Sequence, residues 1–285
     1  MSAVVIDGKK IAAGIRDEVI REVQALKEKG ISPKMAVVLV GDDPASVVYA
    51  RAKEKACQKV GIGYELVRFP ASASEKEVIG KLRELSADPT VHGIMVELPV
   101  PQHISREKVT LEVAPLKDVD CVNPQNRGFL FSRKEGLFPA TPMSCVEILR
   151  RSGINLEGKH VVLVGRGDTV GKPLIFLLLQ ENATVTICHT RTRDLGYHTR
   201  QADVLVAAAG KAGLISGDMI KPGACVVDAG INEVEGGGIT GDVKFEEALN
   251  VAGYITPVPG GVGALTTVLI QKNLIKALRM QRGEA

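Results

Sequence analysis

The sequence contains no tryptophan, and aromatic residues make up only 4% of its 285 positions. Single-stranded nucleic acids bind by stacking on aromatic side chains, so this shortage argues against such a partner. The net charge of +3 is too small to indicate a surface for nucleic acid, because the basic residues are spread along the chain. No apolar run approaches the roughly 20 residues that a membrane-spanning helix needs. We therefore expect no nucleic acid and no membrane among the partners.

Cysteine is also scarce and irregularly placed. The five residues are Cys57, Cys121, Cys145, Cys188 and Cys225. Their number is odd and their spacing matches no metal-ligand motif, so we expect neither a disulfide framework nor a metal site. Residues 1–10 contain no apolar core of signal-peptide length. The simplest interpretation is a protein of the reducing cytoplasm.

Short apolar stretches alternate with helical patterns along the whole chain. Strands are expected at 35–40, 64–69, 91–96, 161–164, 184–188, 204–208, 225–228 and 254–256. Helix signals between them include apolar periodicity over 10–28, an N-cap at Asp43 and a capping box over 74–77. Strands that alternate with helices form parallel βαβ units, so the fold class is α/β. The segment 121–139 lacks this regularity and is expected to be loop with short strands.

A glycine-rich turn follows the strand at 161–164. Gly165-Arg-Gly-Asp-Thr-Val-Gly171 separates this strand from an apolar run at 174–179 that is typical of a helix. In a Rossmann unit, such a turn binds a pyrophosphate, because glycine lets the ligand approach the backbone and the helix end supplies N–H groups. The glycine spacing, G-x-G-x-x-x-G, is one residue longer than the common G-x-G-x-x-G fingerprint of dinucleotide-binding turns. A structural glycine turn that binds no nucleotide is the alternative.

The end of the next strand indicates which dinucleotide is preferred. After Cys188 the sequence reads His189-Thr190-Arg191-Thr192-Arg193. An NAD site usually carries an Asp or Glu here, bonded to the ribose. The hydroxyls and cations found instead, together with Arg166 in the glycine turn, suit a 2′-phosphate and favour NADP. A solvated basic loop is the alternative.

Three side chains in the first half of the chain suggest a second site. Tyr49 and Lys53 lie four residues apart on a predicted helix and project from one face. Glu97 follows the strand at 91–96, and ligands of open α/β sheets bind beyond the carboxyl ends of strands. Glu97 could therefore face the same cleft as Lys53. A surface lysine beside a half-buried tyrosine, and a solvated loop carboxylate, are the alternatives.

Two further segments could contact a ligand. Asp118 or Asp120 could accept paired N–H bonds from an amino-rich heterocycle, or both could be solvated loop residues. Residues 257–263 contain three glycines and two prolines, which predicts a rigid loop with accessible backbone before a terminal helix at 265–280. A plain structural turn would have the same composition.

Taken together, these motifs closely resemble the bifunctional methylenetetrahydrofolate dehydrogenase/methenyltetrahydrofolate cyclohydrolase family, nearly from end to end. The resemblance is carried by Gly41-Asp-Asp-Pro-Ala-Ser46, Tyr49-x-x-x-Lys53, Gly93-Ile-Met-Val-Glu-Leu-Pro99, Lys117-Asp-Val-Asp120, Pro139-Ala-Thr-Pro142, Gly165-Arg166 with Val170-Gly-Lys-Pro173, Asp228-Ala-Gly-Ile-Asn232, Gly241-Asp242 and Ile255-Thr-Pro-Val-Pro-Gly-Gly-Val-Gly263. It implies two lobes: an α/β folate-binding lobe at 1–140 and a Rossmann NADP-binding lobe at 141–264. The C-terminal helix, within 265–285, would return to the first lobe.

The resemblance also implies the site residues, with no metal. Catalysis would involve Tyr49, Lys53, Glu97 and Asp120. Tetrahydrofolate would contact Tyr49, Val96, Leu98, Asp120, Pro259, Gly260, Gly261, Val262 and Gly263. NADP would contact Gly165, Arg166, Gly167, Thr190, Arg191 and Ile231. A cytoplasmic homodimer in one-carbon metabolism and purine biosynthesis would then oxidise 5,10-methylenetetrahydrofolate and hydrolyse the methenyl product.

The chain departs from the family pattern at a few positions. Glu97 replaces a usual glutamine, Cys121 a glycine, Gly167 a serine, and Ala264-Leu265 a Pro-Met pair. The charge of Glu97 would favour the protonated form of Lys53, so a robust dehydrogenase with a weak or alkaline-shifted cyclohydrolase is the alternative form of the function.

Two other classes of protein remain to be separated from this one. A catalytically silent NADP- or folate-binding protein could keep the fold, but retention of Tyr49 and Lys53 argues against it. Another two-lobed Rossmann dehydrogenase, such as a shikimate-type enzyme, would not explain the loop at 257–263 or the Lys-Asp-Val-Asp motif.

Overall fold

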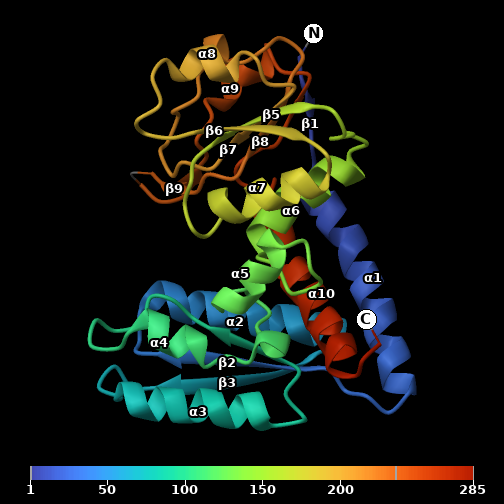
Figure 1. Cartoon of the computed structure of the whole chain (residues 1–285), viewed down its shortest axis with the longest axis vertical. Coiled ribbons are helices and arrows are strands. Elements are labelled where there is room, and N and C mark those ends of the chain that lie inside the picture. The colour runs from blue at the N-terminus through green and yellow to red at the C-terminus, as the bar shows by residue number, and fades with distance from the viewer. Residues whose placement is uncertain (1, 235, 285) are drawn as a thin grey trace. The chain divides into compact units, whose positions relative to one another are not determined.

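The computed structural model describes residues 2–234 and 236–284 and separates into two compact units (Figure 1). The three-stranded unit comprises Gly14–Pro139 and Thr267–Ala285, and the six-stranded unit comprises Met1–Ala13 and Ala140–Thr266. No helix within the described residues combines the length and apolarity needed to cross a bilayer.

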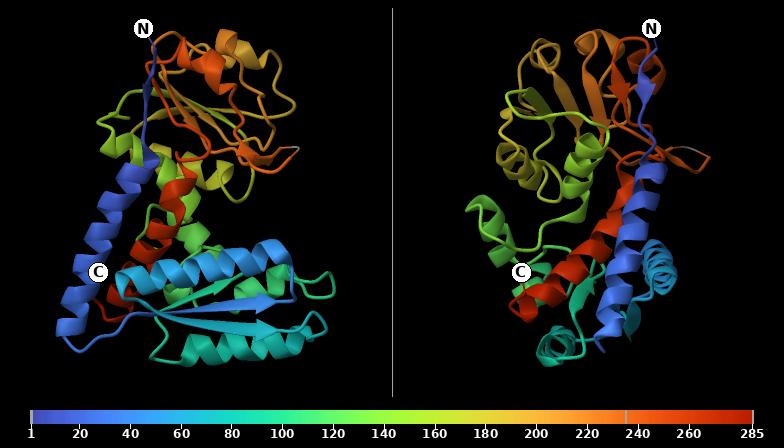
Figure 2. Two further views of the ribbon diagram at one scale, coloured as in Figure 1. Left: turned by 180° about the vertical axis from the view of Figure 1, so that it is seen from behind. Right: turned by 90° about the vertical axis from the view of Figure 1, so that its right-hand side faces the viewer.

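The three-stranded unit is built on a parallel sheet with the strand order β3-β2-β4. Its strands are β2 (Lys34–Val40), β3 (Gly63–Phe69) and β4 (Gly93–Val96). The central strand β2 is buried from Met35 to Val40, as expected for a parallel strand covered on both faces. Figures 1 and 2 show α2 (Pro44–Val60) on one side of this sheet and α3 (Glu75–Ala87) on the other. Shorter helices follow: α4 (Arg106–Leu111), the 3₁₀ turn η1 (Pro115–Lys117) and α5 (Pro124–Phe131).

The predicted helix caps are confirmed. The Asp43 carboxylate accepts the Ser46 N–H at 2.8 Å and so starts α2, which ends at Gly61 in the left-handed conformation. At the start of α3, Ser74 and Glu77 form both hydrogen bonds of a capping box. These local signals fix where α2 begins, and therefore which turns of the helix carry Tyr49 and Lys53.

Two long helices add residues to the three-stranded unit: α1 (Gly8–Glu28) and α10 (Gly263–Gln281). A side chain at Gly93 of β4 would lie 2.4 Å from Leu274 of α10, so only glycine lets this helix pack against the sheet. The C-terminal helix therefore joins the N-terminal half of the chain, which confirms the expected return.

The six-stranded unit contains an all-parallel sheet with the strand order β1-β11-β8-β7-β5-β6. Its strands are β1 (Val4–Val5), β5 (His160–Val164), β6 (Thr184–Cys188), β7 (Val204–Ala207), β8 (Cys225–Asp228) and β11 (Tyr254–Ile255). After β5 the chain forms β6 on one side and then crosses to β7 on the other. Such a reversal marks the point where open α/β sheets bind ligands, beyond the carboxyl ends of the strands.

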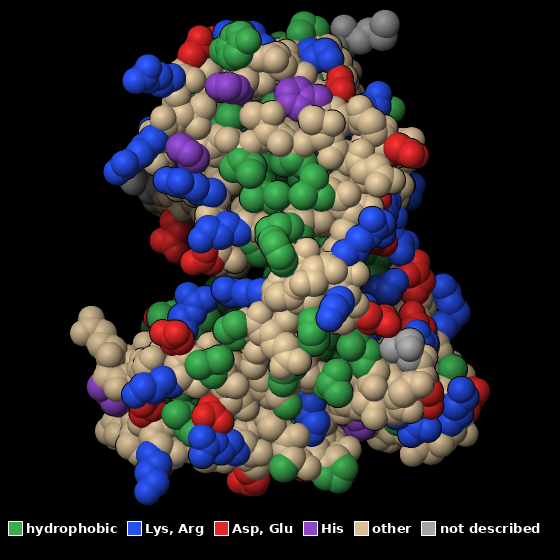
Figure 3. All heavy atoms as spheres, viewed as in Figure 1, with side chains coloured by type: hydrophobic (Ala, Val, Ile, Leu, Met, Phe, Trp, Pro, Cys, Tyr) green, Lys and Arg blue, Asp and Glu red, His purple; other side chains and the backbone are tan. Residues whose placement is uncertain are grey.

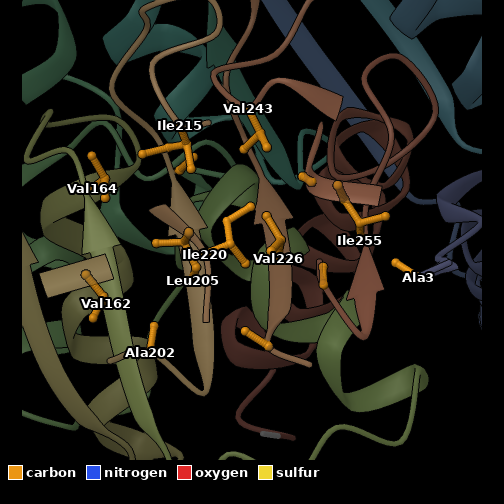
Figure 4. Packing of buried hydrophobic residues seen from close by; sticks show 14 of the residues in the cluster. Ala3, Val162, Val164, Ala202, Leu205, Ile215, Ile220, Val226, Val243 and Ile255 are labelled. Carbon is orange, nitrogen blue, oxygen red and sulfur yellow. The ribbon is translucent and has the colours of Figure 1, made fainter. Parts of the chain in front are cut away.

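Helices and a small hairpin complete this unit. They are α6 (Ala140–Arg151), α7 (Gly171–Gln180), α8 (Leu195–Thr199), the 3₁₀ turn η2 (Gly217–Met219), α9 (Phe245–Leu249), and the antiparallel pair β9 (Asn232–Glu233) and β10 (Ile239–Thr240). The core joins side chains of the neighbouring strands to side chains of the loops that follow them (Figure 4). The strands contribute Val162, Val164, Leu205, Val226 and Ile255, and the loops contribute Ile215, Ile220 and Val243.

The structure differs from the sequence-based expectation in two places. The expected boundary placed residues 1–13 with the first lobe, whereas β1 pairs with β11 and these residues belong to the six-stranded unit. The segment 121–139 contains α5 and no strand among the described residues. Asn123 caps this helix by accepting the Gln125 N–H, and Pro124 occupies its first position.

Candidate functional sites

A lysine–carboxylate pair lies in the three-stranded unit beyond the carboxyl ends of β2 and β4. Lys53 projects from α2, which follows β2, and Glu97 directly follows β4. The Lys53 Nζ donates a hydrogen bond to Glu97 Oε1 at 2.7 Å, and the two side chains are only 14% and 7% exposed. The predicted proximity is therefore present, as an ion pair shielded from most of the solvent.

Tyr49 lies one helical turn before Lys53 on the same face of α2. The Lys53 Nζ is 5.8 Å from the centre of the Tyr49 ring, within the range of a cation–π contact. The tyrosine side chain is 62% exposed, so it forms a free aromatic surface beside the ion pair. An exposed ring next to a mostly buried charge pair is suited to stacking on a flat ligand.

Asp120 supplies a second carboxylate to this site. Partial desolvation and the nearby negative charge of Asp118 raise the pKa of Asp120 to about 7, while Lys53 counteracts the shift and Glu97 adds to it. No described residue donates a hydrogen bond to the Asp120 carboxylate. A partly buried carboxylate without a protein donor is a ready acceptor for N–H groups of a ligand.

Asp118 organises the loop that presents Asp120. Its buried carboxylate accepts the N–H groups of Val122 and Asn123 at 3.0 and 2.9 Å, and the Asn126 side-chain amide at 3.0 Å. Within this loop Cys121 adopts a positive φ of 55°, where glycine is usual. The motif alone left Asp118 and Asp120 open, and the family resemblance singled out Asp120; the Asp118 carboxylate already accepts three donors within the chain.

Val96 and Leu98 flank Glu97 and are placed differently. The Val96 side chain lies in the core of the three-stranded unit, so only its backbone could meet a ligand. Leu98 is half-buried and precedes Pro99 through a cis peptide bond. Of these two predicted contact residues, Leu98 alone presents part of its side chain at the surface.

The predicted glycine turn lies in the six-stranded unit, between β5 and α7. Gly165 has a φ of 126°, and a Cβ there would lie 2.0 Å from the carbonyl oxygen of Ala208, which follows β7. A Cβ at Gly171 would lie 2.6 Å from the carbonyl oxygen of Gly165. Both glycines are therefore required by close backbone packing, whereas a side chain at Gly167 would meet open space.

The predicted ribose-end residues form an exposed, cationic surface. Arg166, Thr190 and Arg191 are all exposed, and neither arginine forms an ion pair with a described residue. In contrast, Lys172 at the start of α7 is paired with Asp168 at 2.6 Å. The turn thus leaves Arg166 and Arg191 free for an anionic ligand.

The loop 257–263 is tightly packed rather than open along its length. A Cβ at Gly261 would lie 2.5 Å from the Pro257 carbonyl oxygen, and a Cβ at Gly8 would lie 2.3 Å from that of Gly261. Gly261 and Val262 are buried, Gly260 is partly exposed with a φ of 105°, and Pro259 and Gly263 are exposed. The Val262 side chain therefore belongs to the core, and the other four residues offer mainly backbone.

The remaining predicted contact residue, Ile231, lies in the loop after β8. Its side chain is 61% exposed, which is unusual for isoleucine and leaves an apolar surface at the carboxyl edge of the sheet. Figure 3 shows the charged and hydrophobic side chains on one face of the molecule. No described residues form a group of three or more potential metal ligands.

These features define an α/β protein of the dinucleotide-binding class with a separate lysine–carboxylate site. Comparison with protein families identifies it further. The model for "Tetrahydrofolate dehydrogenase/cyclohydrolase, catalytic domain" matches residues 6–120, and the model for the NAD(P)-binding domain of the same family matches residues 139–282. The chain belongs to the tetrahydrofolate dehydrogenase/cyclohydrolase family, which confirms the predicted family, fold class and dinucleotide cofactor.

Similar proteins agree over the whole length. The bifunctional protein FolD of Pelotomaculum thermopropionicum is 61% identical over 282 residues, which cover 99% of each chain. The FolD methylenetetrahydrofolate dehydrogenase/cyclohydrolase structure from Campylobacter jejuni has a TM-score of 0.95 at 41% identity, covering 98% of this chain and 100% of that one. The Trypanosoma brucei enzyme, solved with NADP and an inhibitor, has a TM-score of 0.92 at 37% identity and covers 99% of both chains.

Proposed function

We propose that this chain catalyses two successive reactions of tetrahydrofolate. The first oxidises 5,10-methylenetetrahydrofolate to the 5,10-methenyl form with NADP, and the second hydrolyses the methenyl form to 10-formyltetrahydrofolate. The observation that carries the proposal is the Lys53–Glu97 pair beside an acceptor carboxylate, Asp120, within a catalytic domain that shares one chain with an NAD(P)-binding domain.

The first reaction depends mainly on positioning. NADP, when bound, supplies the acceptor for the hydride that leaves the methylene carbon. The protein must hold the folate so that this carbon faces the acceptor. Tyr49 offers an exposed ring for stacking on the folate, and Asp120 offers oxygens to the N–H groups of the pterin.

The second reaction requires movement of a proton. Water adds to the methenyl carbon, the bond from that carbon to N5 breaks, and one proton is released in total. Lys53 is the candidate to carry this proton, because its ammonium lies at the centre of the site. Its Nζ lies 2.7 Å from Glu97 Oε1, so Glu97 holds the lysine in place and is expected to influence this step.

Binding of the dinucleotide would use the glycine turn and the cationic ends of β5 and β6. Gly165 and Gly167 allow the pyrophosphate to approach the N-terminus of α7. Arg166, Thr190 and Arg191 supply charges and a hydroxyl suited to the 2′-phosphate, and Ile231 offers an apolar contact.

One assay tests both activities. The purified protein is mixed with 5,10-methylenetetrahydrofolate and NADP, and NADPH, methenyl and 10-formyl products are followed together; hydrolysis of preformed methenyl substrate is measured separately without cofactor. We expect NADPH formation and cofactor-independent hydrolysis. Binding of NADPH without either reaction would show a silent binding protein instead.

We further propose a cytoplasmic homodimer that supplies one-carbon units, including those for purine synthesis. The five cysteine thiols are free and buried, in keeping with a reducing compartment. Strand β6 is an edge of its sheet and carries the exposed Ile187, and α7 carries the exposed Leu179. Light scattering should give about twice the chain mass of 30.3 kDa, and Ile187→Lys should shift it to the monomer. A monomeric wild type would contradict this proposal.

A further inference from the structure

Asp242 is buried, with no exposed surface, and it forms no ion pair with a described residue. Its Oδ2 accepts the N–H groups of Ala209 and Gly210 at 2.6 and 3.0 Å. Its Oδ1 accepts the Lys211 N–H at 2.8 Å and the Asn232 side-chain amide at 2.9 Å. Four donors thus compensate one buried negative charge, and three of them are consecutive backbone amides of the loop after β7.

A second buried carboxylate supports the first. Asp228, at the end of β8, accepts the N–H groups of Gly230, Asp242 and Val243 at 2.9, 3.0 and 2.9 Å. The packing is so close that a Cβ at Gly241 would lie 1.9 Å from Asp228 Oδ2, and a Cβ at Gly230 would lie 2.3 Å from Asp242 Oδ1. Two carboxylates and two glycines therefore form one rigid assembly, which we call the aspartate hub.

The hub holds the loops that border the predicted cofactor surface. The loop after β7 contacts the glycine turn, since the Ala208 carbonyl oxygen is the atom that excludes a side chain at Gly165. On the other side, Gly230 is bound by Asp228 and Asn232 by Asp242, so both neighbours of the exposed Ile231 are fixed. All these loops lie at the carboxyl ends of β5, β7 and β8, where the strand order reverses.

We propose that Asp242 is a positioning residue for the dinucleotide. It touches no reacting group; it fixes the loops after β7 and β8 so that the glycine turn and Ile231 are preorganised for binding. This inference rests on the proposed NADP-dependent reaction. If Asp242 served general stability alone, its hydrogen-bond donors could lie anywhere in the unit. Instead, all four donors follow β7 or β8 at the carboxyl ends of the strands.

The two activities of the chain give the test an internal control. Asp242→Asn keeps the shape but sets an NH₂ group against two N–H donors, which are left unpaired. We expect the KM for NADP to rise about tenfold or more, with a smaller change in kcat. Hydrolysis of preformed methenyl substrate, which uses no cofactor, should stay within about twofold of wild type, as should the KM for the folate.

A matched control lies in the same sheet. Asp203 also accepts a backbone N–H, from His160 at 3.0 Å, and pairs with Lys221, but at the amino end of β7. Asp203→Asn should leave the KM for NADP unchanged. A milder variant, Asn232→Ala, removes only one donor and should raise the NADP KM less than Asp242→Asn while the protein stays folded.

Two outcomes would overturn the inference. One is a parallel loss of both activities with the melting temperature, which would mark Asp242 as purely structural. The other is an unchanged NADP KM in Asn232→Ala and Asp242→Asn. The dissociation constant of NADPH, measured by fluorescence without folate, judges the inference even if wild type proves to lack dehydrogenase activity.

Discussion

At the scale of single residues, the Lys53–Glu97 ion pair is the feature that separates this site from one with a neutral partner for the lysine. Both side chains are mostly withdrawn from water, so solvent screens their 2.7 Å contact only weakly. Hydride transfer depends mainly on geometry, whereas hydrolysis of the methenyl form must also move a proton at Lys53. The two activities should therefore respond differently to Glu97.

Glu97→Gln tests this difference. Removing the carboxylate charge should increase cyclohydrolase activity near neutral pH severalfold, because the Lys53 Nζ is then no longer held by a charged partner and can move with the reacting group. Dehydrogenase activity should change less than about twofold. Both rates are measured across pH, and Glu97→Asp, which keeps the charge, serves as the control. A fall in cyclohydrolase in Glu97→Gln would mean that Glu97 itself takes part in the reaction.

Asp120 is expected to make folate binding depend on pH. Its pKa of about 7 is raised above the ordinary value near 3.8, so its ionisation in the folded apoprotein is unfavourable. Only the ionised carboxylate accepts two N–H bonds, so the KM for the folate should fall as pH rises from 6 to 8. In Asp120→Asn the KM should be high and nearly independent of pH; a wild-type profile in that variant would remove Asp120 from the site.

The raised pKa of Asp120 predicts that the pH range that favours folate binding lowers the stability of the protein. A carboxyl whose pKa is raised in the folded state stabilises the protein when protonated, and that stability is lost as pH rises from about 4 through 7. The free energy of unfolding of Asp120→Asn should therefore exceed that of wild type at pH 8, with the gap closing toward pH 5.

At the scale of elements, the strand–turn–helix from β5 to α7 carries the glycines and the arginine proposed to bind the dinucleotide. Gly165 and Gly171 are required by backbone packing, whereas the positions from Arg166 to Thr169 between them are exposed. Arg166 is one of these positions, and its guanidinium has no acidic partner among the described residues. The turn therefore combines a rigid backbone with an exposed, unpaired cation at Arg166.

Arg166→Ala should raise the KM for NADP about ten- to a hundredfold and that for NAD far less, since a charged hydrogen bond to the 2′-phosphate is lost. Lys172→Ala is the control, because it removes a positive charge from the same turn that Asp168 already neutralises. Steady-state kinetics with both cofactors decide the matter. Equal losses for NADP and NAD would show that Arg166 does not contact the 2′-phosphate.

Elements whose signals are local could be predicted from the sequence, and elements that depend on distant partners could not. The N-cap signals of α2 and α3 each lie within four consecutive residues. The proximity of Lys53 and Glu97 follows because both come after the carboxyl ends of parallel strands, where ligands of open α/β sheets bind. Strand β1 has only two residues, and its partner lies 250 positions away, from Val4 to Tyr254. Asp118 and Asp242 could not be recognised as organisers because most of their donors are backbone amides of loops, which carry no sequence signal.

At the scale of the whole molecule, neither unit is continuous in sequence. The three-stranded unit requires residues 267–281, whose Asn273 donates to the carbonyl oxygens of Val119 and Phe138 and whose Gln281 donates to those of His92 and Leu116. These bonds, together with the Leu274 contact at Gly93, cover one side of the unit. A fragment of residues 1–139 should therefore fail to fold cooperatively.

Thermal unfolding of that fragment, followed by circular dichroism, should give no sharp transition. Adding a synthetic peptide of residues 263–284 should restore one, because it supplies the missing helix. A peptide in which Leu274 is replaced by aspartate is the control. Cooperative unfolding of the fragment alone would show that α10 is dispensable for the unit.

This discontinuity has a consequence for the newly made chain. Thr267 is added to the chain 128 residues after Pro139. At about 5–20 residues per second, synthesis of that interval takes roughly 6–26 s. During this time the strands of the three-stranded unit have been made, but α10 is not yet available to pack against Gly93. A stretch of apolar surface is thus displayed on the ribosome for seconds, long enough for a chaperone to bind it before α10 arrives.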